Sequence, residues 1–419
     1  MKWNEVAIRK LCLPTRQRDP REKPSEEFSY IDISSIDRDS KMISHISQIL
    51  GSEAPSRARK EIKEGDILIS SVRPNLNAVA TVPPELNGQI ASTGFCVLRP
   101  DIERVIGKYL FYYSRTSDFI ETLCSKVRGA HYPAVSDKDI IDIKIPLPPP
   151  SEQRRIVEIL DQADALRKKR AEADAKAARI LPALFYNMFG DPATNSKGWP
   201  VAPISGMLMP VERKDPSNQP EESFTYIDIA GVDGQLGVIA DTKTLMGAEA
   251  PSRARQLVKA KDVIISTVRP YLRATALVPA QYDNQICSTG FCVLRAKAGL
   301  GFGFLYVLSR LQWFTDQLNA RARGQSYPAV TDADVFNLRM FRPNNDDILK
   351  VFDLHVLEAF ELQGKRREAL SRLDNLSEMI LHLAFTGDLT AKWREAHMKE
   401  LLHEMEQQTK HLNLQRSKA

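Results

Sequence analysis

Hydrophobic and polar residues alternate along this chain in two different ways. Short apolar runs rich in β-branched residues, such as DILISSV (66–72) and FCVLR (95–99), are bounded by Gly, Pro and Asn and predict strands. Apolar residues recur with the helical period in segments 108–126 and 302–321, which predict helices. Because strands and helices follow one another within the same stretches, the pattern predicts domains of mixed α/β (α+β) class.

Two longer segments have only the helical pattern. The first follows the proline-rich PLPPPSEQ (146–153) and extends to about Phe189, and the second extends from about Asp347 to Phe385. Their apolar faces contain Ile156, Leu160, Ala163 and Leu166 in the first, and Val351, Leu354, Leu357, Leu373, Leu376 and Ile380 in the second. Each face needs a partner to bury it, so we expect two long α-helices that pack as an antiparallel coiled coil.

The α/β pattern occurs twice, because the chain contains an internal repeat. The repeated segments are FSYIDISSID (28–37) and FTYIDIAGVD (224–233), EAPSRAR (53–59 and 249–255), DILISSVRPNLNA (66–78) and DVIISTVRPYLRA (262–274), and STGFCVLR (92–99 and 288–295). The spacing is 196 residues in each case, and 195 for RGAHYPAVSDKDI (128–140) and RGQSYPAVTDADV (323–335). This period is far longer than that of a solenoid, so the sequence predicts a duplicated domain followed each time by a long helix.

Composition and charge place few limits on the function. The chain is 43% hydrophobic and 26% charged, with no apolar run of the roughly 18 residues that a membrane span needs and no signal-like N-terminus, so we expect a cytoplasmic protein. Its five cysteines lack CxxC spacing, which argues against a disulfide framework or a zinc site, and we expect Cys96 and Cys292 to be buried. The net charge of +5 permits a polyanionic partner but does not require one.

Motifs for catalysis are missing from the sequence. It contains no Walker A loop, no GxGxxG-type loop after a strand and no NPPY-like tetrapeptide. A nuclease-like Glu61 and Lys63 become Leu257 and Lys259 in the second copy, and His131 aligns with Ser326. The sequence therefore predicts a chain that is not an enzyme by itself and binds no metal.

Three polar loops that carry arginine are present in both copies. Sequence-specific DNA binding needs cations for phosphates and guanidinium, amide or hydroxyl groups for base edges. The candidates are Arg57, Arg59, Arg73, Asn75, Asn77, Arg128, His131 and Tyr132 in the first copy, and Arg253, Arg255, Arg269, Tyr271, Arg273, Arg323, Gln325, Ser326 and Tyr327 in the second. Any single arginine can instead be a surface ion-pair partner, and Tyr132 and Tyr327 can be core aromatics. The occurrence of all three loops in both copies favours DNA binding.

A duplicated α/β domain that alternates with two long helices resembles the specificity (S) subunit of Type I restriction–modification systems. The stretch IPLPPPSEQRRIVEIL (145–160) is similar to that family's junction between a target-recognition domain and its conserved helix. The second junction, FRPNNDDILKVF (341–352), departs from the pattern because it lacks the tandem prolines. The resemblance covers about residues 1–390.

The resemblance implies a domain plan. We expect target-recognition domain 1 at 1–150, helical spacer 1 at 151–190, target-recognition domain 2 at 191–345, helical spacer 2 at 346–390 and a polar helical tail at 391–419. The tail is expected to be mainly a solvated helix. The two halves would be related by internal pseudo-twofold symmetry.

The resemblance also implies partners and a target. Double-stranded DNA would be bound by the two domains, two methyltransferase (M) subunits would dock on the helices, and the restricting form would add two motor-nuclease (R) subunits. No cofactor is expected in this chain, whereas S-adenosylmethionine, ATP and Mg²⁺ would belong to the partner subunits. In this family each domain reads one half of a split target, so two similar domains predict a bipartite, near-palindromic sequence.

Three other interpretations stay open at this point. The chain can be a helical scaffold that does not read DNA, which would show no salt-dependent binding to duplexes. It can be a nuclease with an unfamiliar site, for which only Asp32 and Asp66 and their counterparts Asp228 and Asp262 are repeated acids. It can also be the specificity subunit of a methylase–nuclease fusion system.

Overall fold

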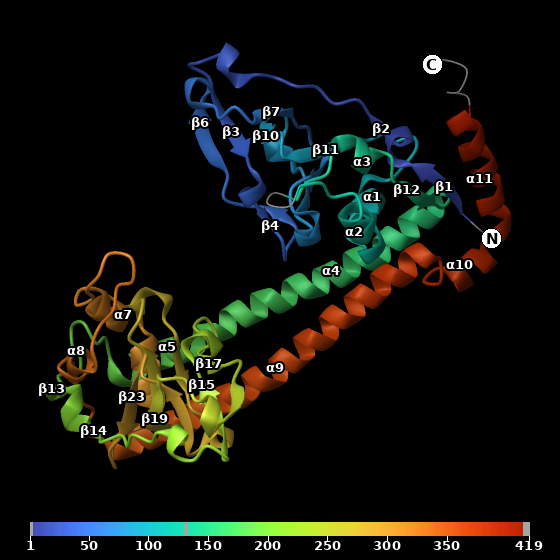
Figure 1. Cartoon of the computed structure of the whole chain (residues 1–419). Helices are drawn as coiled ribbons and strands as arrows, with labels where there is room; N and C mark the ends of the chain where they lie inside the picture. Colours follow the sequence, from blue (N-terminus) through green and yellow to red (C-terminus); the bar gives the residue numbers. More distant parts are fainter. Residues whose placement is uncertain (1–2, 130–132, 414–419) are drawn as a thin grey trace. The chain divides into compact units, whose positions relative to one another are not determined.

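The computed structural model describes residues 3–129 and 133–413 of the chain (Figure 1). These residues belong to two compact units. Unit 1 comprises Met1–Ala171 and Ala369–Ala419, and unit 2 comprises Glu172–Glu368. Each unit therefore holds one copy of the repeat together with parts of both long helical segments.

The α/β domain of unit 1 contains two four-stranded sheets. The first has the order β6-β3-β10-β7, from Ser47–Leu50, Glu27–Ile31, Ile90–Ser92 and Ala58–Glu61; the second has the order β2-β11-β8-β9, from Cys12–Leu13, Phe95–Pro100, Ile67–Ser70 and Val79–Thr81. Two small pairs complete the strands, β1 (Asn4–Ala7) with β12 (Lys144–Leu147) and β4 (Ile36–Asp37) with β5 (Met42–Ile43). All four residues of β8 are buried, because both faces of this strand are covered.

Three short helices cover the second sheet of unit 1. They are α1 (Gly107–Tyr113), α2 (Ser117–Cys124) and α3 (Asp137–Ile141). The Thr116 side chain caps α2, and Ser136 and Asp139 form a capping box at the start of α3. Tyr109 and Phe119 of these helices are fully buried in the main core of the unit.

Unit 2 repeats this architecture strand for strand. Its sheets have the orders β18-β15-β22-β19 (Lys243–Met246, Ser223–Ile227, Gln285–Ser288, Ala254–Val258) and β14-β23-β20-β21 (Leu208–Met209, Phe291–Ala296, Val263–Ser266, Thr275–Leu277), with β13 (Val201–Pro203) paired to β24 (Arg339–Phe341) and β16 (Val232–Asp233) to β17 (Val238–Ile239). Its short helices are α6 (Phe302–Arg310), α7 (Gln312–Asn319) and α8 (Asp332–Phe336). The register is also repeated, since Tyr30 pairs with Ile90 in parallel and Tyr226 pairs with Ile286 in parallel. The predicted duplication of a mixed α/β domain is confirmed.

The first long helical segment is interrupted. The sequence predicts one helix to about Phe189, whereas the structure has α4 (Pro150–Ala178) and α5 (Ile180–Phe189). The break lies at Arg179, whose N–H bonds the Lys176 carbonyl at 3.1 Å. Pro182 explains the break, because it has no N–H to donate to the carbonyl four residues earlier. The second segment, α9 (Asp346–Thr386), lacks proline and forms one helix of 41 residues.

The long helices run antiparallel inside each unit, as predicted, but Leu166, Leu354 and Leu376 of the predicted apolar faces are exposed rather than buried. In unit 1, Leu160 of α4 shares a core with Ala384 of α9, and further along Arg167 Nη2 lies 3.1 Å from Asp374 Oδ1. Residue numbers rise along α4 while they fall along α9. In unit 2, Phe185 of α5 packs against Phe352 of α9 with ring centroids 6.0 Å apart.

The C-terminal tail forms α10 (Ala391–Ala396) and α11 (Met398–Asn413), so its helical character is as expected (Figure 1). Most of its residues are exposed, and one face packs against unit 1. Glu152 at the start of α4 is fully buried, and its carboxylate accepts bonds from Arg394 Nε at 2.7 Å and Trp3 Nε1 at 3.0 Å. A buried carboxylate needs such partners, and the tail supplies one of them.

The last features of the fold concern membrane-spanning helices and the cysteines. Within the ranges that the structure describes, no helix is both long and apolar enough to cross a membrane. All five cysteines are free thiols, and Cys96 and Cys292 are buried as predicted, which raises the pKa of both thiols. Buried thiols of this kind are unreactive and pack as small hydrophobic residues.

Candidate nucleic-acid interface

Backbone hydrogen bonds join the first arginine-bearing loop of unit 1 to the end of β8. The N–H of Thr93 donates to the Arg57 carbonyl at 2.8 Å. The next turn residue, Gly94, accepts through its carbonyl from both the N–H and the Oγ of Ser71, each at 2.9 Å. A Cβ on Gly94 would lie 2.7 Å from the Ile33 side chain, so this turn needs glycine for close packing.

The other two loops of unit 1 are joined to the same place. The N–H of Val135 donates to the Ser71 carbonyl at 2.9 Å, and the N–H of Arg73 donates to the Pro133 carbonyl at 2.8 Å. The loop that contains Arg128 thus lies directly beside the loop that contains Arg73. All three predicted loops meet at one edge of the domain.

Unit 2 has the same hydrogen bonds at the corresponding positions. They run from Thr289 N to Arg253 O (2.8 Å), Thr267 N to Gly290 O (2.9 Å), Val330 N to Thr267 O (2.9 Å) and Arg269 N to Pro328 O (2.7 Å). The repeat therefore preserves the arrangement of the loops and not only their sequences.

An unusual backbone conformation is shared by the two central loops. Arg73 has φ 49° and Arg269 has φ 50°, both left-handed and both directly before proline. Non-glycine residues rarely adopt this region, and a residue before proline is normally extended. The short 3₁₀ helices Pro74–Leu76 and Pro270–Leu272 follow, and Asn77 and Arg273 after them are left-handed again. Such strain concentrates at functional sites.

Several predicted residues present their side chains to solvent. Arg57, Arg73 and Asn75 of unit 1, and Arg253, Tyr271, Gln325 and Ser326 of unit 2, are exposed. Arg128 and Arg323 are also largely exposed, at 80% and 77% of their side chains, and lie 3.7 Å and 3.4 Å from Asp139 and Asp334. Ion pairs this exposed contribute little, so their guanidinium groups can exchange a carboxylate for a phosphate at small cost.

Tyr327 is not a core aromatic. This residue is 69% exposed. The Arg269 guanidinium lies over its ring, with the guanidinium carbon 4.5 Å from the ring centroid. The predicted candidates His131 and Tyr132 lie outside the described residues.

Arg59 and Arg255 have partners within their own units. Arg59 Nη2 lies 3.2 Å from Asp19 Oδ2, and Arg255 Nε lies 3.2 Å from Asp215 Oδ2. Each also donates to a backbone carbonyl of its own loop. These two arginines hold the loop against the preceding segment, which is the surface ion-pair role left open from the sequence.

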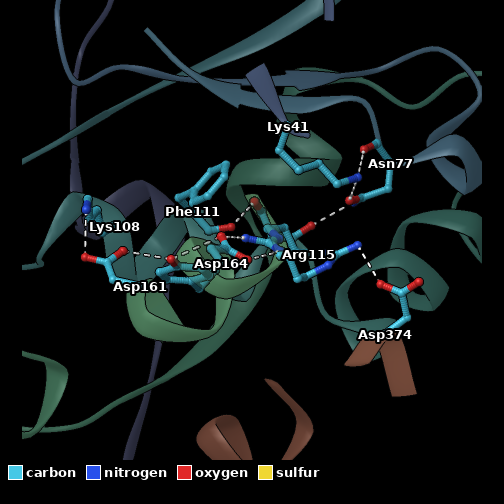
Figure 2. A network of polar contacts seen from close by, with 11 residues as sticks. Lys41, Asn77, Lys108, Phe111, Arg115, Asp161, Asp164 and Asp374 are labelled. Atoms are coloured by element: carbon cyan, nitrogen blue, oxygen red, sulfur yellow. Dashed lines mark hydrogen bonds and ion pairs between the residues drawn. The ribbon is translucent and has the colours of Figure 1, made fainter. Parts of the chain in front are cut away.

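Asn77 belongs to a polar network beneath the loop rather than to its exposed surface (Figure 2). Its Nδ2 donates to the Ser114 carbonyl at 2.8 Å, while Lys41 Nζ donates to the Asn77 carbonyl at 2.7 Å and to Oδ1 at 2.9 Å. Burial and then the neighbouring Arg115 guanidinium lower the pKa of Lys41 to about 8. Lys41 was not predicted from the repeat, because the second copy has Gly237 at this position. In the second copy Arg273 corresponds to Asn77, and this arginine is partly exposed.

The repeated aspartates have structural partners. Asp66 and Asp262 are buried, and Arg99 and Arg295 donate to them from the adjacent strands, each with an Nη2–Oδ2 distance of 2.7 Å. No group of three His, Cys, Asp or Glu residues suited to a metal occurs in the part of the chain that the structure describes. The buried ion pairs remove these two acids as candidates for a nuclease site.

Comparisons with known proteins agree on one family. Residues 2–174 match the family model described as the Type I restriction modification DNA specificity domain. The chain is 24% identical over 332 residues to the Type I restriction enzyme EcoDI specificity subunit of Escherichia coli, covering 70% of this chain and 73% of that protein.

Solved structures extend the match to nearly the whole chain. One chain, from a study of complex assembly and conformational transition of the type I R-M system, has 29% identity and a TM-score of 0.58, covering 93% of this chain and 98% of that one. The HsdS subunit from Thermoanaerobacter tengcongensis has 30% identity and a TM-score of 0.44, with coverage of 92% and 97%. The protein therefore belongs to the specificity subunits of Type I restriction–modification enzymes, the non-catalytic members of these complexes.

Proposed function

We propose that this chain reads a bipartite DNA target, one half-site with each α/β domain, and directs methyltransferase subunits to it. The observation that carries this proposal is the assembly of three arginine-bearing loops by the same backbone hydrogen bonds in both units. Exposed guanidinium groups on these loops suit phosphates and base edges. A strained arginine at the centre of each assembly supports a binding role further.

The likeness of the two loop assemblies supports similar half-sites. Arginine occurs at three exposed or partly exposed positions in both units, namely Arg57 and Arg253, Arg73 and Arg269, and Arg128 and Arg323. These pairs would contact features that the two half-sites have in common. The positions that differ, such as Asn75 and Tyr271, would account for asymmetry. The proposed target is therefore near-palindromic.

The long helices are the proposed docking surface for two methyltransferase subunits. Large apolar side chains remain exposed on them, including Leu166, Leu354, Leu362, Leu376 and Met379. Exposed apolar positions of this kind are typical of protein interfaces. The partners would supply S-adenosylmethionine, and two restriction subunits with ATP and Mg²⁺ would complete the restricting form.

The decisive experiment is genome-wide mapping of N6-methyladenine in the host, with and without this gene. Loss of one bipartite motif is the expected result, and the two half-sites should be similar in inverted orientation. An unchanged methylome in a host that expresses all subunits would instead favour the scaffold interpretation. Unrelated half-sites would contradict the near-palindrome while leaving the DNA-reading role intact.

A binding measurement tests the loops directly. The complex with methyltransferase subunits should bind its duplex with a steep dependence on salt, and Arg57→Ala should weaken binding and reduce that slope by about 1 if the residue contacts a phosphate. Arg9→Ala is the matched control, because Arg9 is also an exposed arginine of unit 1 but pairs with Asp142 outside the three loops. Equal losses of DNA affinity in the two variants would contradict a special role for the loop.

A further inference from the structure

Two loops of unit 2 bring an arginine and a tyrosine together at the surface. The guanidinium carbon of Arg269 lies 4.5 Å from the centroid of the Tyr327 ring. Tyr327 is 69% exposed, which is unusual for so large an apolar ring and leaves the pair accessible. A guanidinium over an aromatic face is attracted by the ring quadrupole, and the attraction grows when water is displaced.

The position of Arg269 is fixed by more than its ring partner. Its N–H bonds the Pro328 carbonyl at 2.7 Å, so the arginine is tied to the loop that carries Tyr327. Its left-handed φ of 50° before Pro270 leaves little backbone freedom. Its Nε is buried and has no hydrogen-bond partner among the described residues. A buried donor without a partner is costly, so this site is built for something other than stability alone.

The buried Nε also limits what the guanidinium can bind. Arginine grips a phosphate or carboxylate side-on through Nε and one Nη, or end-on through its two Nη atoms. Burial of Nε closes the side-on mode. The end-on fork matches the O6 and N7 acceptors of guanine in the major groove.

We infer that Arg269 reads a guanine in the half-site bound by unit 2 and that Tyr327 is the residue that positions it. This inference rests on the proposed DNA-reading function. The ring holds the guanidinium plane before DNA arrives, so less side-chain freedom is lost on binding. A phosphate contact by the same fork would not depend on the base sequence, and the experiment below separates the two.

The test uses the full chain in complex with its methyltransferase subunits. Methylation rates are measured on duplexes in which each base pair of each half-site is changed in turn. Arg269→Lys keeps the charge but loses the fork, so discrimination for one guanine should fall about tenfold or more, with the salt slope unchanged. Tyr327→Leu should lower the same discrimination several-fold, while Tyr327→Phe should retain it because the ring face remains.

The other half-site is the internal control, because unit 1 reads it. The inference is overturned if the Tyr327→Leu variant discriminates for the guanine as well as the unchanged protein does, or if Tyr327→Phe loses as much of that discrimination as Tyr327→Leu. It is also overturned if Arg269→Lys weakens binding to all sequences equally. Thermal unfolding of each variant separates these outcomes from misfolding, and the exposure of Tyr327 predicts an unchanged Tm. Failure of the unchanged complex to methylate any bipartite site would overturn the proposed function instead.

Discussion

The two units keep the same loops but attach their domains to the helices by different chemistry. In unit 1 charged pairs add to an apolar core: Arg115 Nη1 lies 2.6 Å from Asp164 Oδ2, and Lys108 Nζ lies 2.7 Å from Asp161 Oδ2 (Figure 2). Tyr112 also donates to Asp161, at 2.8 Å. Both aspartates belong to α4, so charged pairs hold this domain to its helix.

In unit 2 the corresponding attachment is largely apolar. Phe360 of α9 is partly buried and packs against the core of this domain. Phe360 packs on Tyr306 with ring centroids 5.2 Å apart. Arg310, the counterpart of Arg115, donates to the Gly234 and Gln235 carbonyls instead of a carboxylate.

This difference separates what the repeat preserves from what it leaves free to change. The hydrogen bonds that arrange the loops are the same in both units, whereas the contacts below them differ: unit 1 adds charged pairs between α4 and its domain, and unit 2 adds an aromatic contact from α9. Salt and pH should therefore act on unit 1 more than on unit 2, and loss of apolar volume should act most strongly on unit 2.

The largest expected effect comes from the aromatic core of unit 2. Phe352 of α9 is fully buried against Phe185 and Phe189, so Phe352→Ala should lower the free energy of unfolding of unit 2 by about 3–5 kcal/mol. Hydrogen exchange resolved by residue should show the loss in unit 2. The matched variant Ile156→Ala, at a fully buried position of α4 in unit 1, should instead lower protection in unit 1. Equal loss of protection throughout the chain would show that the units unfold as one.

The next effect is specific to unit 1, where the C-terminal tail satisfies a buried charge. Arg394→Ala removes the cation from the fully buried Glu152 and should destabilise unit 1 by about 3 kcal/mol. Chemical denaturation, monitored by hydrogen exchange in unit 1, measures this change in the free energy of unfolding. Arg9→Ala, which breaks an exposed pair, should cost less than about 1 kcal/mol. A similar small cost for both variants would mean that the tail does not support the domain.

A smaller effect should reveal the polar attachment itself. Asp164→Asn weakens the partner of Arg115, whose side chain is only 10% exposed, and should destabilise unit 1 by about 1–2 kcal/mol. Added salt should reduce the difference between this variant and the unchanged chain, because the lost interaction is partly ionic. Phe360→Leu in unit 2 is the comparison, and its cost should not depend on salt. A salt-independent cost for Asp164→Asn would contradict an ionic attachment.

The smallest effect is a pH dependence confined to unit 1. The pKa of Lys41 is about 8 in the folded chain, lowered from an ordinary value of 10.5 by burial and by the nearby Arg115 guanidinium. Between pH 8 and 10.5 the unfolded chain therefore binds more protons at this residue, so the stability of unit 1 should rise with pH. Because the amine is partly exposed, the expected rise is about 1 kcal/mol.

Thermal unfolding of the unchanged chain and of Lys41→Met across this pH range isolates the contribution. The rise should disappear in the variant, since methionine does not titrate. A rise of the same size in both proteins would assign it to other groups.

The sequence predicted the repeated elements because both copies share their apolar runs and turn residues. Identical segments such as STGFCVLR gave the strand, the turn and its glycine at once, and the register follows from them. The prolines after 145 likewise placed the start of α4 close to Pro150. The break at Arg179 was missed, although Pro182 carried the signal.

The roles of individual site residues were harder to predict. The partner of Arg59 is Asp19, far upstream and with no periodic relation to it, so the ion pair depends on tertiary structure alone. Asn77 and Arg73 are close together in the same loop. The Asn77 side chain joins the polar network beneath the loop, whereas Arg73 is exposed. Their left-handed conformations direct the side chains, and a residue before proline gives no sequence sign of that conformation.

The hydrogen bonds that arrange the three loops join main-chain atoms, with few exceptions. A substitution at Asn75 or Tyr271 changes the side chain offered to a partner without removing any of these bonds. Under the proposed DNA-reading function, new specificities would therefore arise by single mutations at little cost to folding. The two copies of the domain would then be free to change their targets separately while keeping the same main-chain framework.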